Sequence, residues 1–482
     1  MLKIYEHTPE EKVSTDLIVT VNGKQVPVLE CYVSAFPINR RWPGHQRDIS
    51  QREKAYFISF EGDELVDVKV KHKKSFSNVF VRPLSKNVQI SCADNECSFS
   101  INNGFYAVEF DNSHNPLHIF YNKVKKYDVD IKDVNTLYLK KGVYNLEILK
   151  VKSNQTIYIE EGAIVYGCIH GENVENVRIC GRGILDNSKN KEIITKQVSL
   201  GKGGFDVGNS IREHTIKFVN SKNIVIEGIT IRDSLVYNIT TWGCENITVD
   251  DVKIIGCWRY NTDGIDFHNS SHCKVTNCFV RTFDDSICVK GHLGYTDYCE
   301  DILVDNCVIW NDWGHALEIG TETNAKHMHD ITFRNCDIIH VSSMALDIFN
   351  VDYGEVFDVF YENINIEFKM DHQENKFQHD DETTFEFTPF DGRYLPWWLA
   401  LEISKHEEHS KGDIRGKIHD ITYDNVNIIS HRMPPMFIRG YSEDNKVYNI
   451  NFKNVKFNGK RVDSLEEFDL FDMKFYENIK FK

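Results

Sequence analysis

Residues 301–309, DILVDNCVI, and residues 330–338, DITFRNCDI, are two copies of the pattern that decides the fold of this chain. Each copy starts with a polar residue, has apolar residues at its second and fourth positions, and has asparagine at its sixth. A period in the twenties, with short β runs and no helix, is typical of a parallel β-helix in which each repeat forms one coil. Further copies start at His272, Asp358, Asp420 and Asn449 and weaker ones at Asn223 and Asn246, giving successive offsets of 23, 26, 29, 29, 28, 62 and 29 residues.

The recurring asparagine predicts a stacked turn along the β-helix. Asparagine tolerates the left-handed backbone conformation and can hydrogen-bond to its counterparts in neighbouring coils. The 62-residue offset equals about two coils, and we expect its middle, residues 369–398, to form a long loop over one face. The stacked set is Asn277, Asn306, Asn335, Asn363, Asn425 and Asn454.

The first 125 residues carry a different pattern. Short alternating runs, such as residues 16–36 and residues 54–72, are separated by turn signals such as Asn-Gly and Gly-Asp. Regularly spaced short strands of this kind indicate a β-sandwich. We therefore predict an all-β chain with a β-sandwich domain over residues 1–125 and a parallel β-helix (solenoid) domain over residues 126–482.

Composition excludes several classes of protein. The 482-residue chain has a formal net charge of −16, which argues against nucleic acid or an anionic membrane surface as a partner. No apolar signal region or run of transmembrane length occurs. Thirteen cysteines at strand-like positions are expected to be buried thiols, which predicts a cytoplasmic protein. Their spacing fits no metal-binding pattern, so we predict no metal or cofactor, while the oligomeric state stays open.

A second strand in each coil predicts a column of acidic side chains. We align five of these strands on their apolar pairs, from Ile265/Phe267 to Leu401/Ile403. Alternation then places the residue between each pair on the outer face of one parallel sheet, where it borders a carboxylate-rich groove. These residues are Asp266, Cys288, Glu318, Asp347 and Glu402.

Three further aspartates and a histidine precede the same strands. Asp263 lies in an Asn-Thr-Asp-Gly segment, the pair Asp284-Asp285 follows 284 − 263 = 21 residues later, and His315 falls in the next coil. Three carboxylates in one coil repel one another, so at least one should keep its proton near neutral pH. That arrangement favours one general acid with one or two bases, as glycosidic bond hydrolysis requires. The alternative is a solvated acidic turn.

The motif series NTDG, DDSICVKG and GHALEIGTET resembles that of glycoside hydrolase family 28, the polygalacturonase group. Residues 137–167 resemble the start of that family's right-handed parallel β-helix, and the resemblance covers about residues 130–460. A β-sandwich ahead of such a β-helix is similar to dextranase-type relatives. The resemblance implies Asp284 as the general acid, Asp263 and Asp285 as the pair that activates water, and His315 as the support of the acid. It also implies inversion, for which carboxyls about 6.5–9.5 Å apart leave room for a water.

The chain departs from the family at the site of a cation pair. Pectin-cleaving members carry Arg-Ile-Lys in the coil after the histidine, whereas residues 345–349 here read ALDIF. A uronate would face carboxylates there, so we predict a neutral or deoxy sugar as substrate. Arg439 could restore one cation, which leaves a polygalacturonase-type activity on uronates open. The predicted substrate-binding residues are Asp266, Lys290, Glu318, Asp347, Glu402 and Arg439, with Trp313, Trp397 and Trp398 as candidate sugar platforms.

The predicted substrate is a soluble oligosaccharide. The insertion at residues 367–397 and the loop Arg40–Gln46 could close the groove at one end, which favours exo action. A non-catalytic carbohydrate-binding β-helix, a lyase, and an epimerase or transferase remain alternatives. A lyase would need a Ca²⁺ site and a basic residue, and Lys290 is the base near the aspartate pair.

Overall fold

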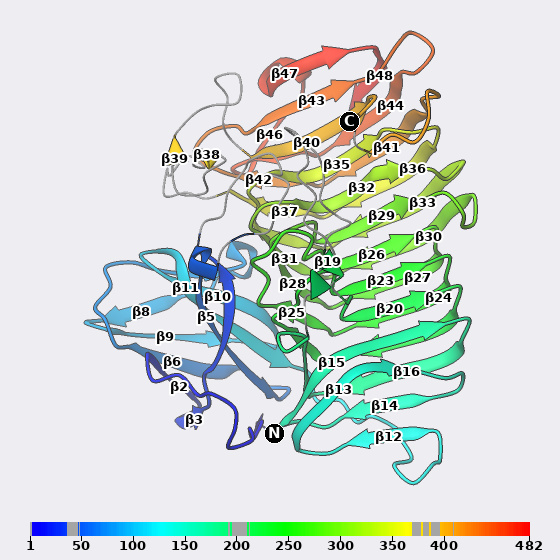
Figure 1. Cartoon of the computed structure of the whole chain (residues 1–482). Helices are drawn as coiled ribbons and strands as arrows, with labels where there is room; N and C mark the ends of the chain where they lie inside the picture. The colour runs from blue at the N-terminus through cyan, green and yellow to red at the C-terminus, as the bar shows by residue number, and fades with distance from the viewer. Residues whose placement is uncertain are drawn as a thin grey trace.

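The computed structural model describes residues 2–35, 47, 49–190, 193–194, 210–211, 213–368, 377–378, 385–386, 396–407 and 409–482. Two units lie side by side, an N-terminal pair of sheets and a long stack of coils (Figure 1). The described residues include only short 3-10 turns as helices. None of these is long and apolar enough to cross a membrane.

The first coils of the larger unit contribute two strands and the central coils three, and the first strand of each coil joins a 12-stranded parallel sheet. The unit is a right-handed parallel β-helix, which confirms the predicted fold class. The sheet comprises, in order, β12 (Thr136–Leu139), β14 (Thr156–Ile159), β16 (Glu175–Gly181), β21 (Lys222–Glu227), β24 (Glu245–Asp250), β27 (Ser271–Thr276), β30 (Tyr298–Asp305), β33 (His327–Arg334), β36 (Glu355–Glu362), β41 (Lys417–Asp424), β44 (Val447–Lys453) and β48 (Tyr476–Phe481).

The other coil strands belong to a 21-stranded sheet that contains two columns of parallel pairs. Column A consists of β23 (Ile239–Trp242), β26 (Ile265–His268), β29 (Ile287–Gly291), β32 (His315–Thr323), β35 (Met344–Asn350), β40 (Trp397–Ile403) and β43 (Pro435–Arg439). Column B consists of β25 (Lys253–Ile255), β28 (Phe279–Thr282), β31 (Val308–Asn311), β34 (Asp337–His340), β37 (Asn365–Glu367) and β42 (Asn427–Ile429).

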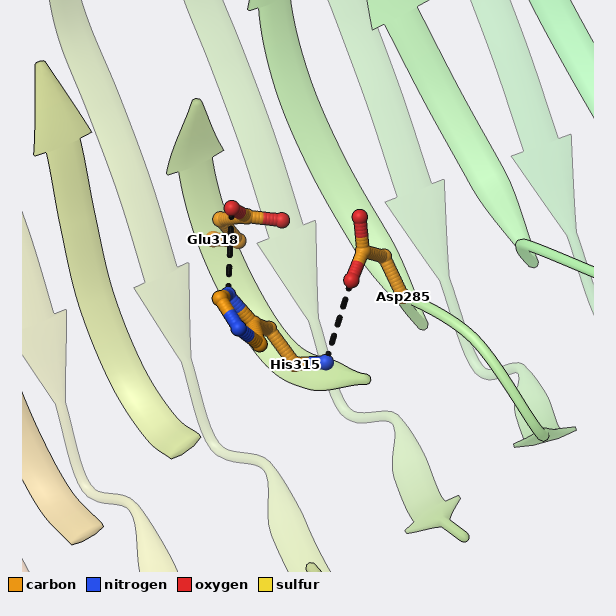
Figure 2. Close-up of side chains that lie close together, drawn as sticks. All are labelled: Asp285, His315 and Glu318. Atoms are coloured by element: carbon orange, nitrogen blue, oxygen red, sulfur yellow. Dashed lines mark hydrogen bonds and ion pairs between the residues drawn. The ribbon is translucent and has the colours of Figure 1, made fainter. Parts of the chain in front are cut away.

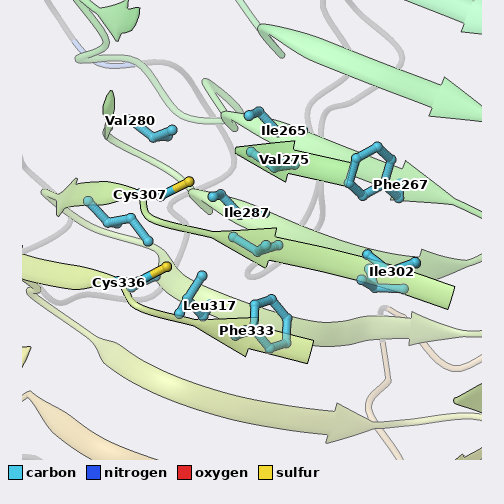
Figure 3. Close-up of a cluster of buried hydrophobic side chains, with 14 of the residues drawn as sticks. Ile265, Phe267, Val275, Val280, Ile287, Ile302, Cys307, Leu317, Phe333 and Cys336 are labelled. Atoms are coloured by element: carbon cyan, nitrogen blue, oxygen red, sulfur yellow. The ribbon is translucent and has the colours of Figure 1, made fainter. Parts of the chain in front are cut away.

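Apolar side chains of like kind stack inside the coils. Ile265, Ile287 and Leu317 occupy equivalent positions in successive strands of column A, and all three are fully buried (Figure 3). Burying each such side chain contributes about 1.5–3 kcal/mol. Alternation of these residues with polar ones therefore fixes which face of column A points outward.

The predicted asparagine turn is confirmed. The six asparagines have φ between 49° and 56°, and Asn306 donates to the side chain of Asn277 at 2.7 Å. The ladder is broken once, because Asn335 donates to Asp305 at 2.8 Å. The first residue of each repeat is also left-handed, as at Asp301 (φ 52°), which the sequence analysis did not foresee.

The 62-residue offset is one coil with an insertion, not two coils as predicted. β36 pairs directly with β41, and β37 pairs with β42, so no further coil lies between them. Most of the insertion falls outside the described residues, as does the loop Arg40–Gln46. The predictions that rest on those two segments therefore stay predictions.

Two sheets of mostly antiparallel pairs form the N-terminal unit, and their last strand ends at Asn122. The first coil strand starts at Thr136, so the predicted boundary falls in the connecting segment. One sheet holds β1 (Lys3–Ile4), β4 (Leu29–Ser34), β5 (Arg52–Glu61), β7 (Val79–Arg82), β10 (Gly104–Phe110) and β11 (Asn112–Asn122); the other holds β2 (Leu17–Val21), β3 (Lys24–Val26), β6 (Val66–His72), β8 (Ile90–Ala93) and β9 (Glu96–Ile101).

The first of these sheets packs on column B. Phe105 and Phe120 meet Phe279 with ring centroids 6.3 and 5.2 Å apart, within a buried apolar cluster shared by both units. Buried ion pairs also cross this interface, such as Arg82 with Glu367 at 2.5 Å. The N-terminal unit thus lies against column B, and the acidic residues described below belong to column A.

Candidate active site

The predicted catalytic residues meet where successive turns enter column A. Asp263 precedes β26, Asp284 and Asp285 precede β29, and His315 is the first residue of β32. One carboxylate oxygen from each of the three aspartates lies within 4.8 Å of those of the other two. Residues 21 positions apart are therefore brought together by the coiling of the chain.

Two glycines permit this close approach of neighbouring turns. A Cβ atom at Gly264 would lie 2.2 Å from the carbonyl oxygen of Ser286. A Cβ atom at Gly314 would lie 2.5 Å from the backbone carbonyl carbon of Asp284. The glycine after Asp263 and the glycine before His315 are thus required by backbone packing at the site.

Lys290 holds the aspartates together from the end of β29. Its Nζ atom donates to Asp263 Oδ2 at 3.1 Å and to Asp285 Oδ2 at 3.0 Å, and it lies 3.5 Å from Asp266 Oδ2. The side chain is 6% exposed, so three carboxylates already neutralise its ammonium group. The structure therefore places Lys290 as a partner of carboxylates, where the sequence analysis expected a substrate contact.

The environments of Asp284 and Asp285 separate their pKa values. Burial raises the pKa of Asp284 well above its usual range, and the charges of Asp263 and Asp285 add to the rise. Burial would also raise the pKa of Asp285, but Lys290 and His315 outweigh it and hold that pKa low. Burial raises the pKa of Asp263 to about 7, although Lys290 opposes this. A protonated acid beside an ionised base is the arrangement for general acid–base catalysis.

Asp284 also makes two backbone contacts that fix its carboxyl group. Its Oδ2 atom accepts a hydrogen bond from the Asn261 N–H at 2.7 Å, and its Oδ1 atom accepts one from the Asp285 N–H at 3.1 Å. The side chain is nearly buried, with an exposed fraction of 7%. A proton on Asp284 would thus be held in a fixed orientation.

His315 lies between Asp285 and Glu318 (Figure 2), and Asp347 of the following coil also contacts it. Its Nδ1 atom is 3.1 Å from Glu318 Oε1 and 2.9 Å from Asp347 Oδ2, and its backbone N–H donates to Asp285 Oδ1 at 3.1 Å. Burial would lower the pKa of His315, but Asp347 and Glu318 raise it well above its usual value. Burial and the charge of Asp285 raise the pKa of Glu318 to about 8.

The predicted column of the outer face is present over four coils, three of which supply an acid. Asp266, Cys288, Glu318 and Asp347 are in register, as predicted. The three acids are fully buried rather than solvated, each with 0% exposure. Such burial is costly for a charge without a partner, which is why their pKa values rise.

Glu402 is not part of this column, which corrects the prediction. Ala400, not Glu402, pairs with Asp347. Glu402 pairs with Phe349, two residues further along the strand. The strand reads WWLALEI, so Leu399 and Leu401 match the apolar pair as well as Leu401 and Ile403 do. Arg439 is not free either, because Glu402 lies 2.7 Å and Asp472 3.0 Å from its guanidinium.

None of the three predicted tryptophan platforms is an open surface. Trp398 is fully buried in the coil core, and Trp397 packs edge-on against Phe437 with centroids 5.1 Å apart. Trp313 stacks on Phe283 at 5.7 Å and is packed against the core. These tryptophans therefore contribute to packing.

The sequence analysis missed an aromatic pair beside the acids. Trp242 and His268 stack with ring centroids 3.7 Å apart, and His268 Nε2 lies 3.7 Å from Asp266 Oδ2. His268 follows Asp266 by two residues and Trp242 is its counterpart one coil earlier. Period-2 alternation was the signal that could have placed both on the same face.

Among the described residues, two groups of donor atoms are compact enough to surround an ion, but both groups already have other partners. In the group of Asp263, Asp284 and Asp285, the ammonium of Lys290 bridges two of the carboxylates. In the group of Asp285, His315 and Glu318, the Nδ1 atom of His315 already contacts two acids. We therefore assign these residues to proton chemistry and identify no metal ligands.

The arrangement of the carboxyls leaves the stereochemistry of the reaction open. The ranges of about 6.5–9.5 Å for inversion and about 5–5.5 Å for retention refer to the separation of whole carboxyl groups. One oxygen of each of the three aspartates lies within 4.8 Å of those of the other two, which is a different distance. Inversion therefore stays a prediction, and the stereochemistry has to be measured.

Comparison with known proteins gives relatives of two kinds. The family described as Glycosyl hydrolases family 28 matches residues 124–370. A polygalacturonase of Medicago sativa is 27% identical over 173 residues, which is 34% of this chain and 38% of the relative. A dextranase of Arthrobacter sp. (strain CB-8) is 22% identical over 218 residues, or 42% of this chain and 32% of the relative. The chain thus spans about a third of the length of each of these relatives.

Solved structures share the fold. Dex49A from Penicillium minioluteum superposes with a TM-score of 0.62 at 16% identity, covering 100% of this chain and 90% of that one. An exopolygalacturonase from Thermotoga maritima gives a TM-score of 0.51 at 16% identity, covering 72% of this chain and 84% of that one. At these identities the likeness concerns the fold alone.

Proposed function

Because the chain belongs to glycosyl hydrolases family 28, we propose that it hydrolyses glycosidic bonds of an oligosaccharide at its three clustered aspartates. The observation that carries this proposal is the opposite shift of two neighbouring carboxyl pKa values, upward at Asp284 and downward at Asp285. A solvated acidic turn or a purely binding surface would not need such a difference.

In the proposed reaction Asp284 is the general acid. Its proton passes to the glycosidic oxygen as the bond to the anomeric carbon breaks, and Asp285 accepts a proton from the water that attacks that carbon. Asp263 shares Lys290 with Asp285 and helps to place the water. The products are two sugars, one with a new anomeric hydroxyl group.

We propose that this attack inverts the anomeric configuration, as the family resemblance implies. The alternative is retention through a covalent intermediate on Asp285. Proton NMR of the first product formed distinguishes them. Initial release of the anomer opposite to that of the substrate supports inversion, and release of the same anomer would establish retention.

We further propose a neutral or deoxy sugar as substrate. The support is that both cations predicted to be available are compensated, Lys290 by three carboxylates and Arg439 by Glu402 and Asp472. A uronate carboxylate placed against uncompensated acids costs several kcal/mol once water is excluded. The relatives bear the names of enzymes for both substrate types, polygalacturonase and dextranase, so an activity on uronates is the alternative.

A side-by-side rate comparison on dextran oligosaccharides and oligogalacturonides tests the substrate class. Faster hydrolysis of the neutral oligosaccharide supports the proposal, and faster hydrolysis of the uronate would refute it. The chain-length profile of the products tests the proposed exo action, because release of end units is expected and cuts within the chain would contradict it.

Location in a reducing compartment, the cytoplasm, remains part of the proposal. Its support is that all thirteen cysteines are free thiols and twelve of them are buried. Fractionation of the source cells followed by detection of the protein would test it. Recovery outside the cytoplasm would contradict it.

A further inference from the structure

We propose that Asp347 is a positioning residue that keeps His315 protonated, so that the charged His315 in turn keeps Asp285 ionised. The effect of this chain of contacts on catalysis rests on the proposed hydrolase function. The state of His315 itself does not depend on it and can be measured without a substrate.

The geometry joins Asp347 to His315 across two adjacent coils. β35 runs parallel to β32, and the backbone of Asp347 is paired with that of Glu318. Asp347 Oδ2 lies 2.9 Å from His315 Nδ1, and Asp347 is fully buried. Asp347 was predicted to bind the substrate, but this oxygen contacts the imidazole of His315.

Glu318 touches the same nitrogen but is the weaker counterion. Its Oε1 atom lies 3.1 Å from His315 Nδ1, slightly further than the oxygen of Asp347. The pKa of Glu318 rises to about 8 through burial and the nearby charge of Asp285. Burial raises the pKa of Asp347 as well, but His315 opposes that rise. Because Asp347 makes the shorter contact and hydrogen-bonds Nδ1, we assign it as the main counterion of His315.

Every charged group that faces His315 among the described residues is an acid. Asp285 faces it from the preceding coil, Glu318 from its own strand and Asp347 from the following coil. The other close ring is uncharged Phe349, with centroids 5.5 Å apart. Lys290 donates to the other oxygen of Asp285, Oδ2, at 3.0 Å.

The charge of His315 acts on Asp285. The backbone N–H of His315 donates to Asp285 Oδ1 at 3.1 Å, and the imidazolium charge helps to lower the pKa of Asp285. By contrast, Asp284 accepts its backbone hydrogen bonds from Asn261 and Asp285. The contacts of His315 thus support the base of the pair, whereas the family resemblance suggested support of the acid.

The first test measures the imidazole titration of His315 by NMR with labelled histidine. The His315→Asn variant, which lacks the resonance, identifies it among the 20 histidines. In the unmodified protein we expect no titration between about pH 5 and 8, the range in which an ordinary histidine with a pKa near 6.5 titrates. A titration midpoint near 6.5 would overturn the proposal, whatever the variants do.

Variants of Asp347 and Glu318 distinguish the effect of the negative charge from the effect of side-chain shape. Asp347→Asn keeps an oxygen near Nδ1 but removes the charge, so the midpoint should fall into the range of about pH 6–8. Asp347→Glu should keep the histidine protonated, and Glu318→Gln is the matched control, with a smaller shift expected. Equal shifts in Asp347→Asn and Glu318→Gln would overturn the assignment of Asp347 as the main counterion.

Kinetics then test the link to the base, with the dextran oligosaccharide or oligogalacturonide that the enzyme hydrolyses. Asp347→Asn should lower kcat on the order of 10-fold to 100-fold with little change in KM. Because a neutral His315 no longer lowers the pKa of Asp285, the acid limb of kcat/KM should move to higher pH than in the unmodified enzyme, and Asp347→Glu should restore the profile. An unshifted profile together with a shifted NMR titration would refute only the catalytic link, and inactivity on every sugar would refute only the proposed function.

Discussion

Two buried carboxyls, Glu109 at the interface between the units and Asp284 at the candidate active site, have pKa values shifted in opposite directions. Glu109 is 2% exposed and Asp284 is 7% exposed. Burial would raise the pKa of Glu109, but His340 and Arg82 outweigh it and hold that pKa well below its usual range. At Asp284 the next charges are acids, and they add to the rise caused by burial. The charges of the neighbouring residues, not the depth of burial, therefore decide whether a buried carboxyl forms a stabilising ion pair or keeps its proton.

The largest expected effect comes from Asp284→Asn. This change removes the proton donor but keeps the shape, so kcat should fall on the order of 10³-fold to 10⁴-fold. Initial rates on the preferred oligosaccharide and calorimetric binding of the same sugar measure it. Retained binding without hydrolysis supports the general acid. Undiminished hydrolysis would contradict that role, and binding with no hydrolysis even in the unmodified protein would indicate a carbohydrate-binding β-helix.

Glu109→Gln is the matching change at the interface. It leaves Arg82 and His340 without their shared carboxylate, and breaking such a buried pair costs about 3–5 kcal/mol. Denaturant unfolding should show this loss, whereas the hydrolysis rate of the folded fraction should stay close to that of the unmodified protein. If Glu109→Gln lowered kcat as Asp284→Asn does, the division of roles between the two regions would be wrong.

Lys290→Met tests whether Lys290 causes the difference between the pKa values of Asp284 and Asp285. Lys290 lowers the pKa of Asp285, so its loss should raise that pKa by about 1–3 units. The acid limb of kcat/KM should move to higher pH by the same amount. A pH–rate profile checks this shift, and Lys446→Met, at an exposed ion pair with Glu443, is a control that should leave the limb in place.

The smallest expected effect is the change in the free energy of unfolding that Asp284→Asn causes. A carboxyl whose folded pKa is raised destabilises the protein above its unfolded pKa of about 3.9, and this cost disappears below that pH. The amide should therefore increase the free energy of unfolding by about 1–2 kcal/mol at pH 7 and by nothing at pH 3.5. Thermal unfolding at both pH values measures the difference, and equal stabilisation at both would argue against a raised pKa.

The sequence predicted those features that depend on a repeating pattern. Asn277 and its counterparts marked one corner of the coils, and alternation placed Asp266, Glu318 and Asp347 in one column. The pattern failed where it was ambiguous, as in the apolar run that contains Glu402. An offset of 62 residues likewise fits two coils or one coil with an insertion, and spacing alone cannot distinguish them.

The partners of the acidic side chains could not be read from the sequence. Lys290 and His315 were each expected to act within the groove, but which oxygen they contact depends on rotamers and on the neighbouring coil. The bond between Asp347 and His315 spans 32 residues and no motif records it. The charge balance of this site can therefore be determined only from the three-dimensional arrangement of the neighbouring coils.

The stacking of coils has a consequence for the order in which the chain folds. Neighbouring coils join residues close in sequence, such as Asn306 and Asn277, which are 29 apart, whereas Arg82 reaches Glu367 across 285 residues. Closing a short loop costs less entropy than closing a long one, and solenoids propagate from one repeat to the next. We therefore expect the coils to form successively as the chain emerges from the ribosome. Packing of the N-terminal β-sandwich against coils that lie as far as 285 residues later in the chain would be the final and slowest step.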